Sequence, residues 1–195
     1  GDAIQNIAAG AHPAWAKVDF ESQNLVFLYP ALNQPRALWI APAGTPPPPG
    51  PALSLDLWLW SEMMGGVATL SAPLVDAFVP QMLNYESIGG VNFKKGCYPG
   101  QEIVARSQFR GTLKRRTYVA HADQALAVGN EVFQAAGPEQ PCGTVVQVAP
   151  APDGGFDALV SMQIAAAEAG GLHAVSANGP ALELHPLPYA LLDDI

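Results

Sequence analysis

The chain has 195 residues, of which 49% are hydrophobic and 13% are charged, and its formal net charge is −8. This composition provides enough apolar material for the core of one large domain or two small ones. The acidic balance argues against general affinity for nucleic acid, and no apolar run reaches the ~18 residues of a membrane span.

The first half of the chain predicts a small antiparallel sheet. Strands are expected at residues 16–20, 24–29 and 36–41, because these runs are apolar and aromatic and their connections are too short for parallel crossovers. Residues 42–51 contain six prolines, which exclude a helix and predict an extended surface linker. A polyproline ligand for a partner domain is the alternative interpretation of this run.

Residues 53–64 fit either a strand or a helix. Leucines alternate along the first half of the segment, as they do in a strand. The length of the segment, Ser54 as a cap and the stop at Gly65 favour a helix, which we expect to be largely buried.

The second half of the chain predicts a small β-barrel, because short strands follow one another between turns rich in Gly, Pro, Asp and Asn. The expected strands are residues 117–121, 130–134, 143–149, 156–164, 173–176 and 181–184. The predicted fold class is therefore α+β, with a sheet and helix part followed by a barrel.

One thiol stands in a basic segment that leads into a predicted helix at residues 102–109. The segment consists of Lys94, Lys95, Gly96, Cys97, Tyr98, Pro99, Gly100, Gln101 and Glu102. Nearby cations and a helix N-terminus both favour a thiolate over a thiol. Cys97 is thus a candidate to attack, to oxidise or to bind metal. The alternative is that Cys97 is a small buried filler, as many free cysteines are.

A basic island surrounds this thiol. Residues 94–116 hold seven of the nine basic residues and one acidic residue, so this stretch has a charge of +6 and the remainder −14. Such an island in an acidic chain indicates a local anionic partner, although a solvated surface is the alternative. Besides the two lysines, its members are Arg106, Arg110, Lys114, Arg115 and Arg116.

The cysteine motif resembles the signature of the YgfZ family, folate-binding relatives of the glycine-cleavage T-protein. Residues 80–84, 89–93 and 184–189 add weaker matches. The resemblance implies a T-protein-like folate-binding domain at residues 1–112 and a barrel at residues 113–195. Relatives carry a further N-terminal segment, so we expect this chain to begin partway through the family's fold.

The resemblance also implies a function: a folate-binding protein that assists assembly or repair of iron–sulfur enzymes, including those that modify tRNA. The implied cofactor is tetrahydrofolate, with or without a polyglutamate tail. Trp58 would stack on its pterin ring, although a plain core role is the alternative. An acidic residue that relatives place near Trp58 is displaced here to Glu62, which weakens the expectation of a carboxylate contact to folate.

The resemblance implies that Cys97 is the reactive centre, or one ligand of a transient iron–sulfur cluster shared with another protein. A cluster usually takes four protein ligands, so one cysteine cannot enclose it. Tyr98 and Gln101 would shape the approach to the thiol. The basic island would receive the glutamate tail of folate, an acidic partner or RNA, and direct binding of nucleic acid is left open.

Two other functions stay open. One is a folate-dependent one-carbon transferase, although aminomethyltransferases lack the cysteine motif, and the other is a non-catalytic interaction module. Whether the chain is an enzyme is not decided by the sequence.

The histidines and the second cysteine do not predict a further functional site. The four histidines show no metal-ligand spacing, and Cys142, without cationic neighbours, is expected to be structural. Two cysteines do not make a disulfide framework and no signal segment opens the chain, so we expect a cytoplasmic protein.

Overall fold

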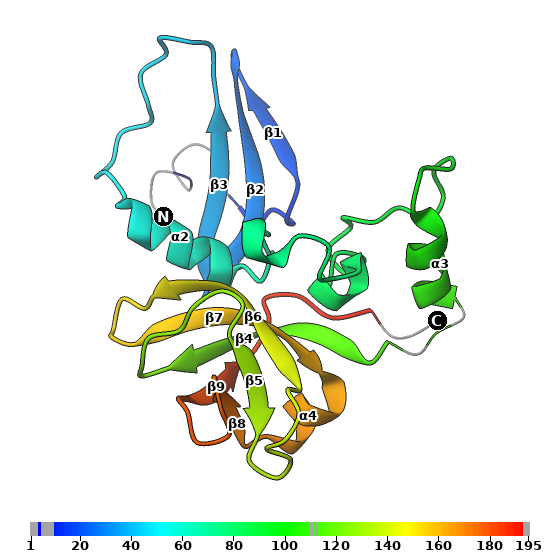
Figure 1. Cartoon of the computed structure of the whole chain (residues 1–195). Helices are drawn as coiled ribbons and strands as arrows, with labels where there is room; N and C mark the ends of the chain where they lie inside the picture. The colour runs from blue at the N-terminus through cyan, green and yellow to red at the C-terminus, as the bar shows by residue number, and fades with distance from the viewer. Residues whose placement is uncertain (1–3, 5–9, 110, 112, 193–195) are drawn as a thin grey trace.

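The computed structural model describes residues 4, 10–109, 111 and 113–192 (Figure 1). Its first part is a three-stranded antiparallel sheet in the order β1-β2-β3, formed by β1 (Lys17–Phe20), β2 (Gln23–Ala31) and β3 (Gln34–Ile40). Two short turns connect these strands, and Glu21, Leu32 and Asn33 take a positive φ there. The predicted antiparallel meander is confirmed.

Helix α2 (Leu55–Met64) follows the proline-rich linker, which contains no helix. It begins after Ser54, whose hydroxyl accepts a hydrogen bond from the backbone N–H of Leu57 at 3.3 Å. The prediction of a capped helix is confirmed, but the prediction that it is largely buried is wrong. Its buried residues lie at the C-terminal end, where the helix packs on the barrel, and Leu55 remains 69% exposed at the other end.

Two 3₁₀ turns, η1 (Ala72–Leu74) and η2 (Pro80–Leu83), lead toward the cysteine motif and α3 (Gln101–Phe109). The predicted helix after the motif is therefore confirmed. Figure 1 shows α3 standing to one side of the sheet and the barrel, with α2 on the opposite side. Within the described ranges, no helix combines the length and apolar character needed to cross a membrane.

The second part of the chain is a closed antiparallel barrel in the strand order β4-β7-β6-β5-β8-β9. Its elements are β4 (Arg115–Ala122), β5 (Glu131–Gln134), β6 (Gly143–Pro150), β7 (Phe156–Gln163), α4 (Ile164–Ala169), β8 (Leu172–Ala174) and β9 (Ala181–His185). The predicted barrel is confirmed. The short helix α4 was not predicted, because it follows β7 directly and its N-cap residue, Gln163, makes no capping hydrogen bond through its side chain.

Apolar side chains cover both faces of the central barrel strands. Ala120 and Ala158 point into the barrel, in a cluster with Val132 and Met162. Their neighbours on β4 and β7 point outward and pack against the C-terminal end of α2. Since alternate residues of a strand face opposite sides, β4 and β7 are buried on both faces and link the two parts of the chain.

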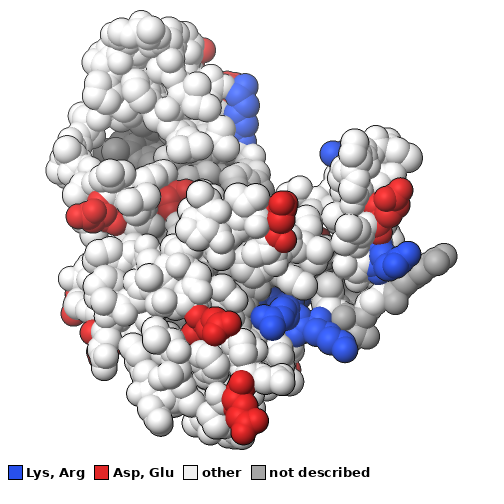
Figure 2. Space-filling view, in the orientation of Figure 1, with Lys and Arg blue, Asp and Glu red and all other residues white. Residues whose placement is uncertain are grey.

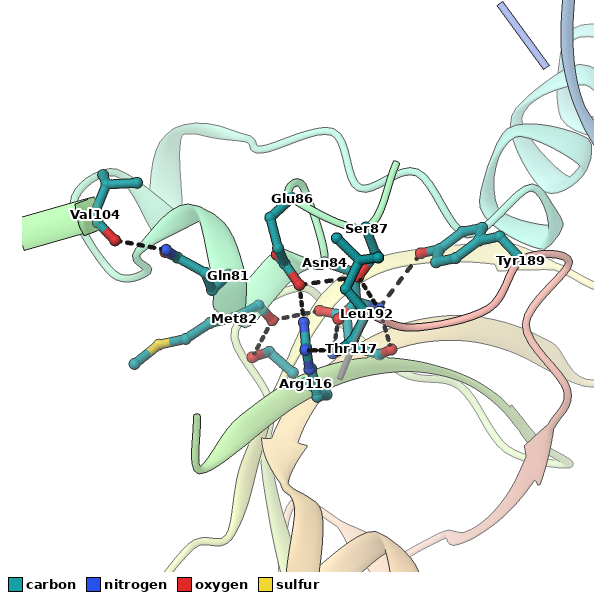
Figure 3. Close-up of polar contacts among 11 residues, drawn as sticks. Gln81, Met82, Asn84, Glu86, Ser87, Val104, Arg116, Thr117, Tyr189 and Leu192 are labelled. Atoms are coloured by element: carbon teal, nitrogen blue, oxygen red, sulfur yellow. Dashed lines mark hydrogen bonds and ion pairs between the residues drawn. The ribbon is translucent and has the colours of Figure 1, made fainter. Parts of the chain in front are cut away.

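A buried polar network joins the turn after η2 to strand β4 (Figure 3). Asn84 takes a positive φ, and its amide both donates to the carbonyl of Thr117 at 2.7 Å and accepts from the N–H of Thr117 at 3.1 Å. Tyr189 extends the network to the chain after α2, because its hydroxyl donates to the carbonyl of Gly66 at 2.6 Å. This network fixes the segment from which the cysteine motif departs.

Candidate functional site

Cys97 lies exposed on an irregular loop directly before α3. A reciprocal pair of hydrogen bonds closes the turn that follows it. The backbone N–H of Tyr98 donates to Oε1 of Gln101 at 3.3 Å, and the N–H of Gln101 donates to the carbonyl of Tyr98 at 3.3 Å. Gly100 has φ +82°, a conformation that a residue without Cβ adopts most readily. Gln101 and Gly100 therefore shape the turn beside the thiol.

The two lysines of the motif have different positions. Nζ of Lys95 lies 4.5 Å from the ring centroid of Tyr98, a cation–π contact close to Cys97 in sequence. Lys94 is exposed, and its backbone N–H donates to the side chain of Asn92 at 2.8 Å. The alternative that Cys97 is a buried filler is excluded by its exposure. The preference of Cys97 for the thiolate form stays a prediction.

Cys142 has the opposite environment. It is 5% exposed inside the barrel, and burial raises the pKa of its thiol. The prediction that Cys142 is structural is confirmed. Cys97 is therefore the accessible one of the two thiols in the chain.

We call residues 94–109, the motif loop and α3, the motif arm. Few contacts hold it. Gln81, fully buried in η2, donates from Nε2 to the carbonyl of Val104 at 2.7 Å (Figure 3). The buried side chains of α3 are Val104 and Gln108. The motif arm thus presents its thiol to solvent, while buried side chains of α3 and the hydrogen bond from Gln81 attach the helix to η2.

Three members of the basic island line one cavity. Arg106, Lys114 and Arg115 surround a space of about 470 Å³ together with apolar side chains that include Met82 and Leu113. A cavity with cationic groups and apolar walls suits an anionic ligand that also has an apolar part. We call it the basic cavity. Arg110, also predicted to belong to the island, lies outside the described residues.

Arg116 does not belong to this exposed group, which corrects its predicted place in the patch. It is 4% exposed and forms an ion pair with the buried carboxylate of Glu86. Its Nη2 also donates to the carbonyl of Leu192 at 2.7 Å. The partner of Arg116 is thus internal and acidic, because the fold brings Glu86 to it from outside the basic stretch.

The island is divided into two groups. Lys94 and Lys95 lie before α3, and Arg106 lies in its last turn, beside the basic cavity. Nine residues of helix separate these ends by about 13 Å at 1.5 Å per residue. Figure 2 shows most blue side chains of this face beside and below α3. The thiol and the basic cavity are therefore neighbouring features and not one pocket.

Trp58 is half-buried on α2, and one face of its ring is already occupied. The guanidinium carbon of Arg36 lies 5.0 Å from the ring centroid. Arg36 is itself ion-paired with Glu62, and its burial lowers the pKa of its guanidinium to about 10. Trp58 therefore has at most one ring face left for stacking. Glu62 is not free to contact a pterin, which agrees with the doubt that the sequence raised.

The described residues fit folate in part only. Trp58 supplies an aromatic surface, but it does not line the basic cavity or either of two other cavities found among the described residues. Figure 1 places α2 and α3 on opposite sides of the molecule, so Trp58 and the basic cavity do not form one site. The neighbouring Trp60 has a different role, because its indole N–H donates to Asp157 of the barrel at 2.6 Å.

The structure defines an α+β protein with a closed barrel, in which Cys142 is buried in the barrel core and Cys97 is exposed on a basic loop. No family model matches the chain. It is similar to the tRNA-modifying protein YgfZ of Cronobacter sakazakii, with 37% identity over 139 residues that cover 69% of this chain and 42% of the relative. The YgfZ protein of Sodalis glossinidius is 29% identical over 205 aligned positions, covering 98% of this chain and 60% of the relative.

Relatives named tRNA-modifying protein YgfZ also occur in Escherichia coli, at 33% identity over 69% of this chain and 42% of the relative. The chain belongs to the YgfZ family. The matches cover only 42% to 60% of the length of these three relatives.

Proposed function

We propose that the chain acts in tRNA modification as part of a YgfZ-type protein, with Cys97 as its reactive group. The observation that carries this proposal is the exposure of Cys97 on the motif arm, in contrast to the buried Cys142. The names of the relatives support the tRNA part of the proposal, because all three described above are called tRNA-modifying proteins.

We further propose that Cys97 assists the assembly or repair of iron–sulfur enzymes that modify tRNA. An exposed thiolate is a good ligand for iron–sulfur clusters, which take four protein ligands as a rule. Cys142 cannot join Cys97 at such a cluster, because it is buried in the barrel. The cluster is therefore cargo in this proposal, with Cys97 as one ligand and the partner enzyme supplying the others.

The basic cavity has a place in the same proposal. Arg106, Lys114 and Arg115 offer charge-assisted hydrogen bonds to carboxylates or phosphates. Such groups occur on a polyglutamate tail, on an acidic partner and on RNA. The cavity lies one helix length from Cys97, which allows an anionic partner to be held there while the thiol stays accessible.

We propose folate binding as an additional property, which is tested independently of the role of Cys97. Trp58 would stack on the pterin with the ring face that Arg36 leaves free. Because Glu62 is engaged by Arg36, we expect weak binding of tetrahydrofolate by this chain. Titration with tetrahydrofolate, followed by fluorescence, tests this. Saturable binding that Trp58→Ala abolishes would support it, and identical curves for both proteins would refute it.

The main test is functional replacement in a bacterium that lacks its own YgfZ protein. The chain, Cys97→Ser and Cys142→Ala are expressed there, and methylthiolated nucleosides in tRNA are measured by mass spectrometry. We expect the chain and Cys142→Ala to raise these nucleosides, and Cys97→Ser to leave them at the level of the empty strain. Full restoration by a stably expressed Cys97→Ser chain would overturn the role of the thiol.

A further inference from the structure

Three potential metal ligands meet on the outer face of the barrel, away from the motif arm. They are His121 on β4, Asp157 on β7 and His185 at the end of β9, and their ligand atoms all lie within 4.8 Å of one another. The spacing of the histidines along the sequence does not predict a metal site. The fold corrects this for His121 and His185, which are 64 positions apart but lie on adjacent strands.

The strand register explains this meeting. His121 lies directly opposite Asp157 in the β4–β7 pair. In the β4–β9 pair, Val119 is opposite His185, so His185 is the diagonal neighbour of His121 on the same face. Ala120 and Ala122, which flank His121, point into the barrel. All three ligand side chains therefore point outward from three consecutive strands of a closed barrel, which is a rigid support.

The carboxylate is fixed from two sides. Nε1–H of Trp60 donates to Oδ2 of Asp157 at 2.6 Å, and Nδ1 of His121 lies 2.7 Å from Oδ1. Asp157 is 6% exposed, so its charge is largely shielded from water. In metal sites, hydrogen bonds of this kind orient the ligating carboxylate. Trp60 is thus a positioning residue that leaves Oδ1 directed at His121.

A structural ion pair between His121 and Asp157 does not account for His185. The His185 ring packs edge-on against His121, with centroids 6.3 Å apart, and its nitrogens have no hydrogen-bond partner in the part of the chain that the structure describes. The backbone of Gly155 also lies close to the His121 ring. A Cβ at this position would lie only 2.9 Å from Nε2 of His121, so a side chain here would crowd that nitrogen.

The surrounding charge favours a cation. Oδ1 of Asp123, a fully exposed side chain, lies 3.7 Å from Nε2 of His121. Glu183 lies opposite His121 in the β4–β9 register, on the same face. Carboxylates at the rim raise the local concentration of cations. Asp123 is also close enough to His121 to approach an ion bound there.

We propose that His121, Asp157 and His185 bind a divalent transition-metal ion, of which Zn²⁺ is the representative used here. Two imidazoles and one carboxylate are a ligand set for Zn²⁺, and three protein ligands leave a fourth position for water. Two ligands about 2.0–2.1 Å from a tetrahedral Zn²⁺ stand about 3.3 Å apart. The ion therefore replaces the 2.7 Å hydrogen bond between His121 and Asp157 after a shift of a few tenths of an ångström.

The test uses the whole chain in a Cys97→Ser background, because the exposed thiol is itself a metal ligand. Metal is removed with a chelator, Zn²⁺ is titrated by calorimetry, and Co²⁺ is titrated by its visible d–d absorption. We expect one equivalent to bind with a Kd of about 1 μM or lower, and a tetrahedral Co²⁺ spectrum.

Variants assign the ligands. His185→Ala is the main one, because it removes no hydrogen bond among the described residues, and we expect it to weaken binding at least 10-fold. Trp60→Phe keeps the three ligands but removes the hydrogen bond to Oδ2 of Asp157. We expect the affinity for the metal to fall about 10-fold. His173→Ala is the matched control, because His173 also lies in the barrel, with Nδ1 3.0 Å from the carbonyl of Gly179.

The experiment distinguishes a loss of metal binding from a loss of folding. Melting curves without metal establish that each variant is folded. Absence of saturable binding by the Cys97→Ser chain would overturn the proposal. So would an unchanged Kd in folded His185→Ala, or an equal loss in His173→Ala.

Discussion

The barrel and the motif arm differ in how many of their side chains are buried. In the barrel, β4 and β7 bury side chains on both faces, and residues such as Val119, Ala120 and Val160 are fully buried. The motif arm buries only Val104 and Gln108 of α3 and leaves its cysteine exposed. The buried core and the exposed thiol therefore lie in different regions, so Cys97 is exposed without any opening of the barrel core.

The two regions also use charge differently. Arg116 at the start of the barrel is buried and paired with Glu86, whereas Arg106 on the motif arm is exposed at a cavity. Both come from the same basic stretch of sequence. The difference teaches that one run of basic residues can supply both a buried ion pair and cations that line a cavity. Four predictions follow from this contrast, from the largest effect to the smallest.

Arg116→Ala is expected to cause the largest loss, because it leaves the Glu86 carboxylate buried without its partner. The side chain of Glu86 is 1% exposed, and breaking such a pair costs about 3–5 kcal/mol of unfolding free energy. Urea unfolding measures this. Arg106→Ala is the control, with an expected change within about 0.5 kcal/mol.

A double substitution sharpens the same test. Arg116→Met combined with Glu86→Leu removes both charges, and we expect it to regain most of the lost free energy. A loss below about 1 kcal/mol in Arg116→Ala alone would contradict the structural role of this ion pair.

The buried phenol of Tyr189 makes the folding stability of the chain depend on pH above about pH 10. Burial raises the pKa of Tyr189 from 10.0 to about 12. Between these values the unfolded chain loses the phenolic proton and the folded chain keeps it, so stability is complete below pH 10 and falls as the pH rises toward 12. The loss is on the order of 2 kcal/mol.

Tyr189→Phe isolates this effect from other groups that titrate at high pH. At pH 8 the variant lacks the hydrogen bond to Gly66 and should be about 1 kcal/mol less stable than the parent. As the pH rises from 10 to 12 this difference in stability should shrink and then reverse, because only the parent loses stability through the Tyr189 phenol. A gap that stays constant over this range would contradict the raised pKa.

Gln81→Leu tests how the motif arm is attached. The change removes the hydrogen bond to Val104 at nearly constant volume, and we expect the amides of α3 to exchange with deuterium about 5-fold faster. Barrel amides should keep their rates. Gln163→Leu, at an exposed position of β7, serves as the control and should leave α3 unchanged. Faster exchange throughout the barrel would show that Gln81 supports the whole fold instead.

Cys97→Ser should have the smallest effect on stability. Cys97 is exposed, so we expect a change in unfolding free energy within about 0.5 kcal/mol. Cys142→Ser is the matched comparison, because a hydroxyl placed in the barrel interior costs about 1–3 kcal/mol. Equal losses in both variants would remove the distinction between the two thiols.

Local patterns determined the elements of this fold and the position of its thiol. The three strands of the first sheet, the helix after Ser54, the helix after the motif and all six barrel strands follow from apolar periodicity, caps and turn residues. These signals act over a few residues, so they can be read directly from the sequence. The exposure of Cys97 agrees with its basic, glycine-containing surroundings.

Tertiary structure alone decided which of these residues meet. Glu86 reaches Arg116 across 30 positions and removes it from the basic island. Arg36 reaches Trp58 and Glu62 from another element, and so limits the predicted folate contact. His121, Asp157 and His185 converge only because the barrel register places three strands side by side. Pairings between distant strands depend on the closure of the whole barrel, and sequence spacing does not encode them.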